Sequence, residues 1–167
     1  MTASTADVSE TEQLSERIVE FLSAGGTLGE LHGHGEAHLE SLYALGHHLY
    51  SNTRYHDAKL IFGYLVIQNH REPRYTNAYA SSLKMTGDAK EAIKYYSISS
   101  MLDMDDPFPT FYTAECLLTL NFITEAKEAL GFVLQRCDAP QYSELKARAE
   151  AMLGLLDTSP TAAPKSE

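Results

Sequence analysis

The sequence has few cysteines, few basic residues and no long uncharged segment, and each shortage excludes a class of protein. Its 167 residues include two cysteines, Cys116 and Cys137, too few for the disulfide framework of a secreted domain. The longest run without Asp, Glu, Lys or Arg covers residues 41–53, whereas a membrane-spanning helix needs about 18 or more apolar residues. The first 20 residues hold one basic residue and no apolar core, so we expect no secretory signal.

Acidic residues outnumber basic residues by 23 to 13, which gives a formal net charge of −10. Such a surface repels phosphate backbones and anionic lipid, so we expect neither nucleic acid nor a membrane as a direct partner. Two reduced thiols are typical of a cytoplasmic protein. The sequence contains no Gly-rich phosphate loop, no G-x-S-x-G and no Cys–His pair in a recognisable context, so it predicts neither an enzyme nor a cofactor.

The hydrophobic pattern is helical throughout, and it repeats every 34 residues. Three kinds of position recur with this spacing: small residues (Gly46, Ala80, Ala114), leucines (Leu49, Leu83, Leu117) and alanines (Ala58, Ala92, Ala126). This period is the length of a tetratricopeptide (TPR) repeat, which is a pair of helices. The sequence therefore predicts an all-α fold of three tandem TPR repeats forming a right-handed superhelix, with an N-terminal helix and a C-terminal capping helix.

The two ends differ from the middle in composition. Residues 1–8 and the tail 158–167 have too little apolar surface to offset chain entropy, so we predict that both are disordered. Residues 9–36 form an N-terminal helical region, with a helix at about 10–24 that opens with Ser9 and Glu12 at capping-box spacing and ends at Gly25-Gly26. Thr27 and Glu30 have the same capping-box spacing.

Residues 37–139 hold the three repeats, at about 39–72, 73–106 and 107–139, and residues 140–157 form the capping helix. The expected helices of the repeats cover 37–51, 54–69, 73–85, 88–101, 107–120 and 123–136. Leu42, Leu45, Gly46 and Leu49 form the inner stripe of the first of them. Asp106 before Pro107 is a good N-cap, and Asp88 with Glu91 is a capping pair.

Stacked helix pairs leave one concave face, lined by the first helix of each pair. Residues on these helices but off the packing stripe should face it: Tyr43, His47 and Tyr50, then Asn77, Ser81 and Lys84, then Phe111, Glu115 and Leu118. Aromatic side chains suit a surface that is sometimes covered and sometimes exposed. We interpret this set as a peptide-binding groove; packing in the core or a dimer is the alternative.

All seven histidines lie between His32 and His70. His34 and His38 have i, i+4 spacing, but Gly33 and Gly35 make a helix there doubtful, and no H-E-x-x-H or paired C-x-x-C occurs. We therefore predict no metal site. Sensitivity to pH is a second hypothesis, and solvated or capping histidines are the simplest interpretation.

Four segments together suggest a family: 25–28 (Gly-Gly-Thr-Leu), 39–46, 55–58, and 112–118 with its Ala-Glu-Cys. With the repeats and the leading helix, the chain resembles the class II chaperones of bacterial type III secretion over about 10–157. The resemblance implies a non-enzymatic protein of the bacterial cytoplasm. It would keep hydrophobic translocator proteins soluble and secretion-competent, with an extended N-terminal segment of the client lying in the groove.

The resemblance also assigns roles to individual residues. Groove aromatics of the family map onto Tyr43 and Tyr50, and the position between them, often aromatic, is His47 here. The leading helix of the family contributes to a homodimer, which makes Leu14, Ile18, Phe21 and Leu22 candidate contacts. A TPR adaptor that scaffolds folded partners or co-regulates transcription of secretion genes is the competing hypothesis.

Overall fold

The computed structural model describes residues 5–158, with side chains from residue 12 onward, and every regular element in that part of the chain is helical. In chain order these are α1 (Thr5–Ser23), α2 (Leu28–Leu31), α3 (Glu36–Ser51), α4 (Tyr55–Gln68), α5 (Pro73–Met85), α6 (Ala89–Leu102), α7 (Phe108–Thr119), α8 (Ile123–Arg136), the 3-10 turn η1 (Pro140–Tyr142) and α9 (Ser143–Thr158). None of the described helices is both long and apolar enough to cross a membrane. The expected disorder of 1–4 and 159–167 lies outside the described residues.

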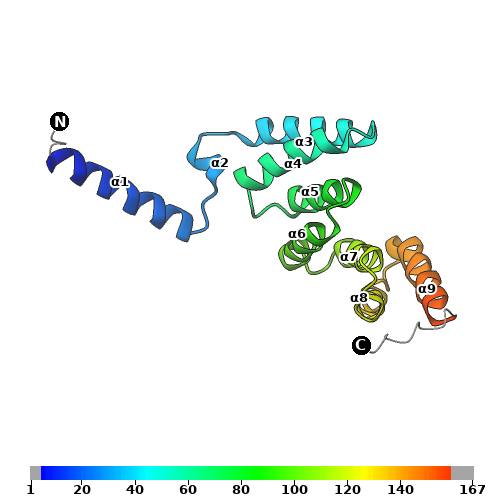
Figure 1. Cartoon of the computed structure of the whole chain (residues 1–167). Helices are drawn as coiled ribbons and strands as arrows, with labels where there is room; N and C mark the ends of the chain where they lie inside the picture. Colours follow the sequence, from blue (N-terminus) through cyan, green and yellow to red (C-terminus); the bar gives the residue numbers. More distant parts are fainter. Residues whose placement is uncertain (1–4, 159–167) are drawn as a thin grey trace, which may run out of the picture.

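Three helix pairs, α3–α4, α5–α6 and α7–α8, stack in chain order, and α9 packs against α8 (Figure 1). The six helices of these pairs begin and end within one residue of the limits expected from the 34-residue period. Pro73 occupies the first turn of α5, where a missing N–H costs no hydrogen bond. The limits of these six helices, predicted from the pattern of small and large residues, are therefore confirmed to within one residue.

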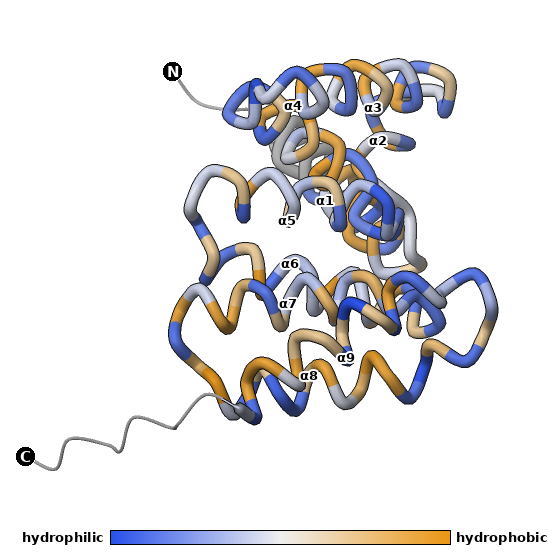
Figure 2. Tube along the Cα trace, turned by 90° about the vertical axis from the view of Figure 1, so that its right-hand side faces the viewer, coloured by the Kyte–Doolittle hydropathy of each residue, from blue (hydrophilic) through white to orange (hydrophobic). Residues whose placement is uncertain are grey.

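Small residues at the repeat positions let the two helices of a pair approach closely. A Cβ atom on Gly46 of α3 would lie 2.5 Å from the Phe62 ring of α4, so only glycine fits there. The corresponding Ala80 and Ala114 are fully buried. Hydrophobic stretches of neighbouring helices, such as α8 and α9, run beside one another through the stack (Figure 2). The core is thus a series of clusters between helices rather than one central mass.

Three local expectations were wrong. Helix α1 begins at Thr5, so residues 5–8 are helical rather than disordered, and Ser9 lies inside the helix rather than at its cap. Leu45 is 44% exposed and does not belong to the inner stripe of α3. The side chain of Asp88 makes no cap hydrogen bond, because it accepts one from Lys59 of the preceding pair instead.

One capping box formed as expected, and the expected cap at Asp106 is displaced by one residue. At α2 the Thr27 hydroxyl accepts the Glu30 N–H. The Glu30 carboxylate in turn accepts the N–H and the hydroxyl of Thr27, and the bonds to the carboxylate lower the pKa of Glu30. At α7 the N-cap is Pro107 rather than Asp106, but the Asp106 carboxylate accepts the N–H of Phe108 at 2.9 Å. Both contacts fix the direction in which the chain enters a helix.

Helix α1 extends away from the stacked pairs (Figure 1). Its junction with α2 is held from one side by Arg71, whose guanidinium donates to the carbonyl oxygen of Gly25 at 2.6 Å. From the other side, Phe21 folds back onto Gly26, where a Cβ atom would lie 2.3 Å from the Phe21 ring. Gly25 adopts φ +92°, which favours glycine at this turn.

Candidate functional site

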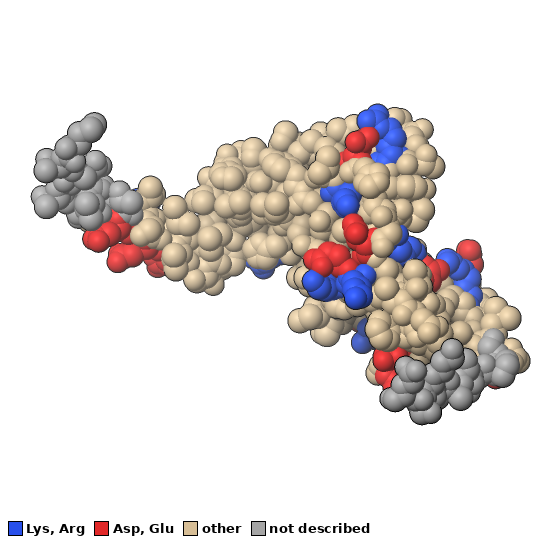
Figure 3. Space-filling model, in the orientation of Figure 1, with Lys and Arg blue, Asp and Glu red and all other residues tan. Residues whose placement is uncertain are grey.

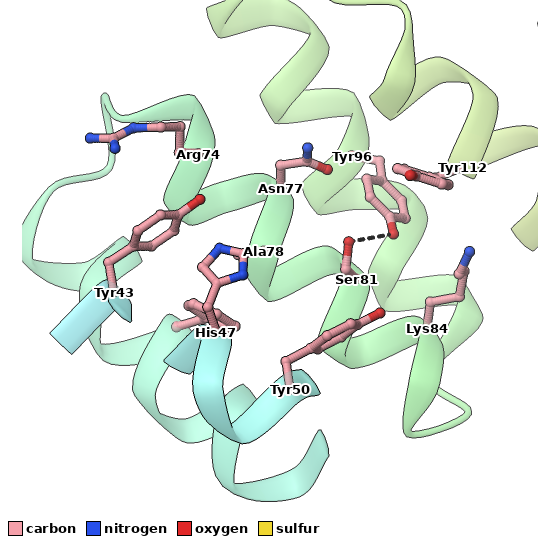
Figure 4. A pocket seen from close by; sticks show the side chains of 11 residues that line it. Tyr43, His47, Tyr50, Arg74, Asn77, Ala78, Ser81, Lys84, Tyr96 and Tyr112 are labelled. Carbon is pink, nitrogen blue, oxygen red and sulfur yellow. Dashed lines mark hydrogen bonds between the residues drawn. The ribbon is translucent and has the colours of Figure 1, made fainter. Parts of the chain in front are cut away.

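A hollow of about 310 Å³ lies between α3 and α5, and α6 and α7 close its far side (Figure 4). It is lined by Tyr43, His47, Tyr50, Phe62, Arg74, Asn77, Ala78, Ser81, Lys84, Tyr96 and Tyr112. The aromatic rings come from α3, α4, α6 and α7, while α5 contributes most of the polar side chains. An amphipathic cleft of this kind is suited to holding a short stretch of polypeptide.

The α3 wall consists of side chains at i, i+4 and i+7, which share one face of the helix. The His47 ring meets Tyr43 edge-on at 4.5 Å between centroids and the buried Phe62 at 5.3 Å. Burial lowers the pKa of His47 and raises the pKa of Tyr43 and of Tyr50. At neutral pH the wall is therefore an uncharged aromatic surface that is partly open to water.

Ion pairs mark the two ends of the α5 wall. At its start, Arg74 donates to Glu40 at 2.7 Å and to Glu72 at 2.9 Å, and its guanidinium stacks 5.2 Å from the centre of the Tyr43 ring. Burial raises the pKa of Glu72, but hydrogen bonds from Arg74 outweigh it and leave the pKa below its usual value. The arginine is thereby fixed against the aromatic wall rather than free in solvent.

At the other end, Lys84 pairs with Glu115 of α7 at 2.5 Å, and Arg148 of α9 donates to the same carboxylate at 3.3 Å. The Lys84 ammonium also lies 4.6 Å from the centre of the Tyr112 ring. One carboxylate therefore ties α5, α7 and α9 together at the end of the hollow.

The floor of the hollow contains two polar groups in different states. The Ser81 hydroxyl is paired with the Tyr96 hydroxyl at 3.0 Å, and burial strongly raises the pKa of Tyr96 (Figure 4). Oδ1 of Asn77 is buried but has no hydrogen-bond partner among the described residues. The first group is satisfied within the protein, whereas the second is not.

Six of the nine residues expected on the concave face line the hollow: Tyr43, His47, Tyr50, Asn77, Ser81 and Lys84. Of the three from the last repeat, Phe111 was placed wrongly, because its ring is fully buried in the cluster of α7, α8 and α9 under Arg148. Glu115 is held in its two ion pairs, and Leu118 is half-buried outside the lining set. The last pair therefore contributes little to the hollow.

Arg74 and Tyr112 line the hollow but were not among the expected residues. Arg74 lies three residues before Asn77 on α5, one turn earlier on the same face, and this spacing could have identified it. Tyr112 comes from α7 next to the buried Phe111, and only the way in which α7 packs against α6 turns its ring toward the hollow.

No group of three or more His, Cys, Asp or Glu side chains that could hold a metal ion is found among the described residues. His34 stacks on His38 at 5.3 Å between ring centroids, and its Nε2 lies 3.3 Å from the Tyr64 hydroxyl of α4. His32 hydrogen-bonds Gln68 at 3.3 Å. His32 and His34 thus join the α2–α3 segment to α4, away from the hollow.

The four candidate dimer contacts on α1 are unequally available. Leu14 and Leu22 are exposed, by 56% and 41%, while Ile18 is half-buried and Phe21 packs onto Gly26. The neighbouring Val19, 62% exposed, was not among the candidates. Acidic side chains gather on α1, whereas acidic and basic side chains mix over the helix pairs (Figure 3).

No family model matches the chain. The low calcium response locus protein H of Yersinia pseudotuberculosis is 30% identical to it over 149 residues, 88% of each chain. The crystal structure of a T3SS complex from Aeromonas hydrophila superposes with a TM-score of 0.83 at 33% identity, covering 86% of this chain and 96% of that one. The Yersinia enterocolitica type III secretion chaperone SycD, crystallised with a peptide of the translocator YopD, gives a TM-score of 0.71 at 28% identity, covering 74% of this chain and 95% of that one.

Proposed function

This chain belongs to the class II translocator chaperones of type III secretion, and we propose that it binds an extended segment of a hydrophobic translocator in the hollow between α3 and α5. The observation that carries the proposal is the aromatic wall of α3, which stays partly open to water instead of closing into a core. The crystallised pairing of the related SycD with a YopD peptide supports a peptide as the occupant.

The geometry accounts for how such binding would protect a client. An extended peptide can place alternate side chains against the rings of Tyr43, His47 and Tyr50 while its backbone stays accessible to the α5 wall. Covering an apolar segment removes it from aggregation or premature membrane insertion. Because the chaperone binds the unassembled client, mass action alone shifts the population, and no nucleotide is required.

The setting of this activity is the bacterial cytoplasm, where a translocator would wait before export. The role is one of binding rather than catalysis. This fits the hollow, where the ion-paired groups hold helices together rather than meeting at a reactive centre.

A homodimer through α1 is part of the proposal. Leu14 and Leu22 lie exposed on a helix that extends from the stacked pairs, and large apolar side chains in that position are typical of a protein interface. Ile18 and Phe21 contribute to the same stripe, although Phe21 also holds the turn at Gly26.

Co-expression tests the chaperone function. The protein is produced together with the large product of a neighbouring gene that carries long apolar segments, and the soluble yield of that product is measured. A chaperone raises the yield and co-purifies with the client, whereas an adaptor for folded partners leaves the yield unchanged. An unchanged yield would contradict the proposal.

A further inference from the structure

We infer that the end of α6 and the turn after it form a second docking surface, which binds a basic amphipathic helix of a partner protein. Four large apolar side chains are exposed within seven residues of the chain: Ile98, Met101 and Leu102 on α6, and Met104 in the turn. Met101 and Met104 are 77% and 69% exposed. Single apolar side chains are common on protein surfaces, but a group of this size is typical of an interaction site. We call these four residues the α6 corner.

The α6 corner lies on the side of α6 that faces away from the hollow. Tyr96 lines the hollow from α6, and Ile98, Met101 and Leu102 follow it by two, five and six residues. Because each residue of an α-helix turns the chain by about 100°, these three positions lie about 140–240° around the helix from Tyr96. One ligand in the hollow and another on the α6 corner can therefore be bound at the same time.

The charges around the α6 corner select a basic partner. Asp103 and Asp105 are exposed beside the apolar group, and neither forms an ion pair with any residue that the structure describes. One turn before Ile98 on the same helix, Lys94 is paired with Glu91 at 2.6 Å. The carbonyl end of α6 adds partial negative charge at the corner. Lys or Arg side chains beside the apolar face of a partner would complement this unpaired negative charge.

The surface also favours a helical partner over an extended one. The main chain of α6 is bonded within the helix as far as Asp103, whose N–H donates to the carbonyl oxygen of Ser99 at 3.0 Å. An extended segment would find few partners here for its own N–H and C=O groups, whereas a helix brings these groups already bonded. Apolar side chains at i, i+3, i+4 and i+7 of such a helix would pack on the corner, where the flexible side chains of Met101 and Met104 adapt to their shape.

Fluorescence anisotropy with three labelled peptides tests the surface on the full chain. The first is a side-chain cross-linked helix with Leu at i, i+3, i+4 and i+7 and Lys beside this face. The second carries Glu in place of Lys, and the third has the composition of the first but places Leu at alternate positions. We expect the Lys helix to bind about tenfold more tightly than either control, because binding needs both the opposite charge and the helical spacing. Binding no tighter than that of either control would overturn the inference.

Two variants assign the binding to the α6 corner. Met101→Gln with Met104→Gln removes the apolar contact at unchanged side-chain length and should weaken binding of the Lys helix about tenfold. Asp103→Asn with Asp105→Asn should reduce the tenfold preference for Lys over Glu to about twofold, as high salt should do for the wild type. Phe132→Gln, which changes an exposed ring of α8 outside the corner, is the control and should alter neither value. Unchanged binding in the methionine variant, or an equal loss in Phe132→Gln, would overturn the inference.

Two further measurements distinguish this partner from other occupants of the α6 corner. The Lys helix should bind the purified complex with the co-expressed client as tightly as it binds the free protein. Competition by the client would assign the corner to the client and overturn the inference. The methionine variant should sediment with the mass of the wild type, and a shift to monomer would assign the corner to a second copy of the chain, which would also overturn it. None of these results changes the test of the proposed function, which depends on the soluble yield of the client.

Discussion

Tyr43 of α3 and Phe111 of α7 occupy the same position of the repeat, yet one ring lines an open hollow and the other is fully buried. The difference lies in what covers each helix. Beside α3 the next pair leaves a space that α5 lines with polar side chains, whereas α9 packs on the last pair and places Arg148 over the Phe111 ring. The repeat position therefore sets the direction of a side chain, and the neighbouring element decides whether that side chain is accessible.

Truncating a buried side chain of the last helix pair should therefore lower the stability of the protein. Phe111→Ala removes a fully buried ring from the cluster of α7, α8 and α9, and such changes cost about 3–5 kcal/mol of unfolding free energy. Urea denaturation followed by circular dichroism measures the loss. A change below about 1 kcal/mol would mean that the ring is not packed as described.

Truncating side chains of the first helix pair that line the hollow should weaken client binding instead. Tyr43→Ala combined with Tyr50→Ala removes two half-buried rings from the hollow and should weaken client binding about 100-fold, as loss of two aromatic anchors does. The helical circular dichroism should stay intact. Phe132→Ala, an exposed ring on α8 outside the hollow, is the control. Unchanged client solubility in the double variant would contradict the assignment of the hollow.

Glu115 joins the two regions, and its removal should have a smaller effect. Glu115→Gln breaks the contacts with both Lys84 and Arg148, which are a quarter to a half exposed, so we expect a loss of about 1 kcal/mol. Thermal unfolding at low and high salt measures it. The difference from wild type should shrink at high salt, because ions screen the wild-type pairs. A difference that is independent of salt would exclude an electrostatic origin.

His47 should make client binding depend on pH. Burial already lowers its pKa below the usual value of about 6.5, so the neutral ring is the favoured form. A client that covers the ring lowers the pKa further. Affinity is therefore retained at pH values above the pKa of His47 and is lost as the pH falls through that pKa. Between pH 7.5 and 5.5 we expect a loss of about three- to tenfold, which His47→Phe should abolish. Equal pH profiles for the two proteins would remove His47 from the site.

The helices could be predicted from the sequence because the 34-residue period is encoded in the packing residues themselves. Gly46, Ala80 and Ala114 must be small for two helices to touch, so their spacing carries the architecture. The capping box at Thr27 followed from the same local rules. Asp88 did not, because its carboxylate is used by Lys59 of another pair, and a contact between distant residues leaves no local pattern.

The site could be predicted only where a helix face is left uncovered. The face of α3 was placed in the hollow because i, i+4 and i+7 share one side of a helix. The contribution of Tyr112 and the burial of Phe111 depend on how α7 sits between α6 and α9, which the period does not specify. The burial of the Asn77 side-chain oxygen likewise depends on how the helices around α5 pack, which no local pattern specifies.

Photo-crosslinking from within the hollow shows whether the client lies there. A photoreactive phenylalanine replaces His47 in one variant and Phe132 in another, and each variant is irradiated in complex with the co-expressed client. We expect position 47 to crosslink to one short client segment and position 132 to give no crosslink. Crosslinking from position 132 together with none from position 47 would contradict this expectation.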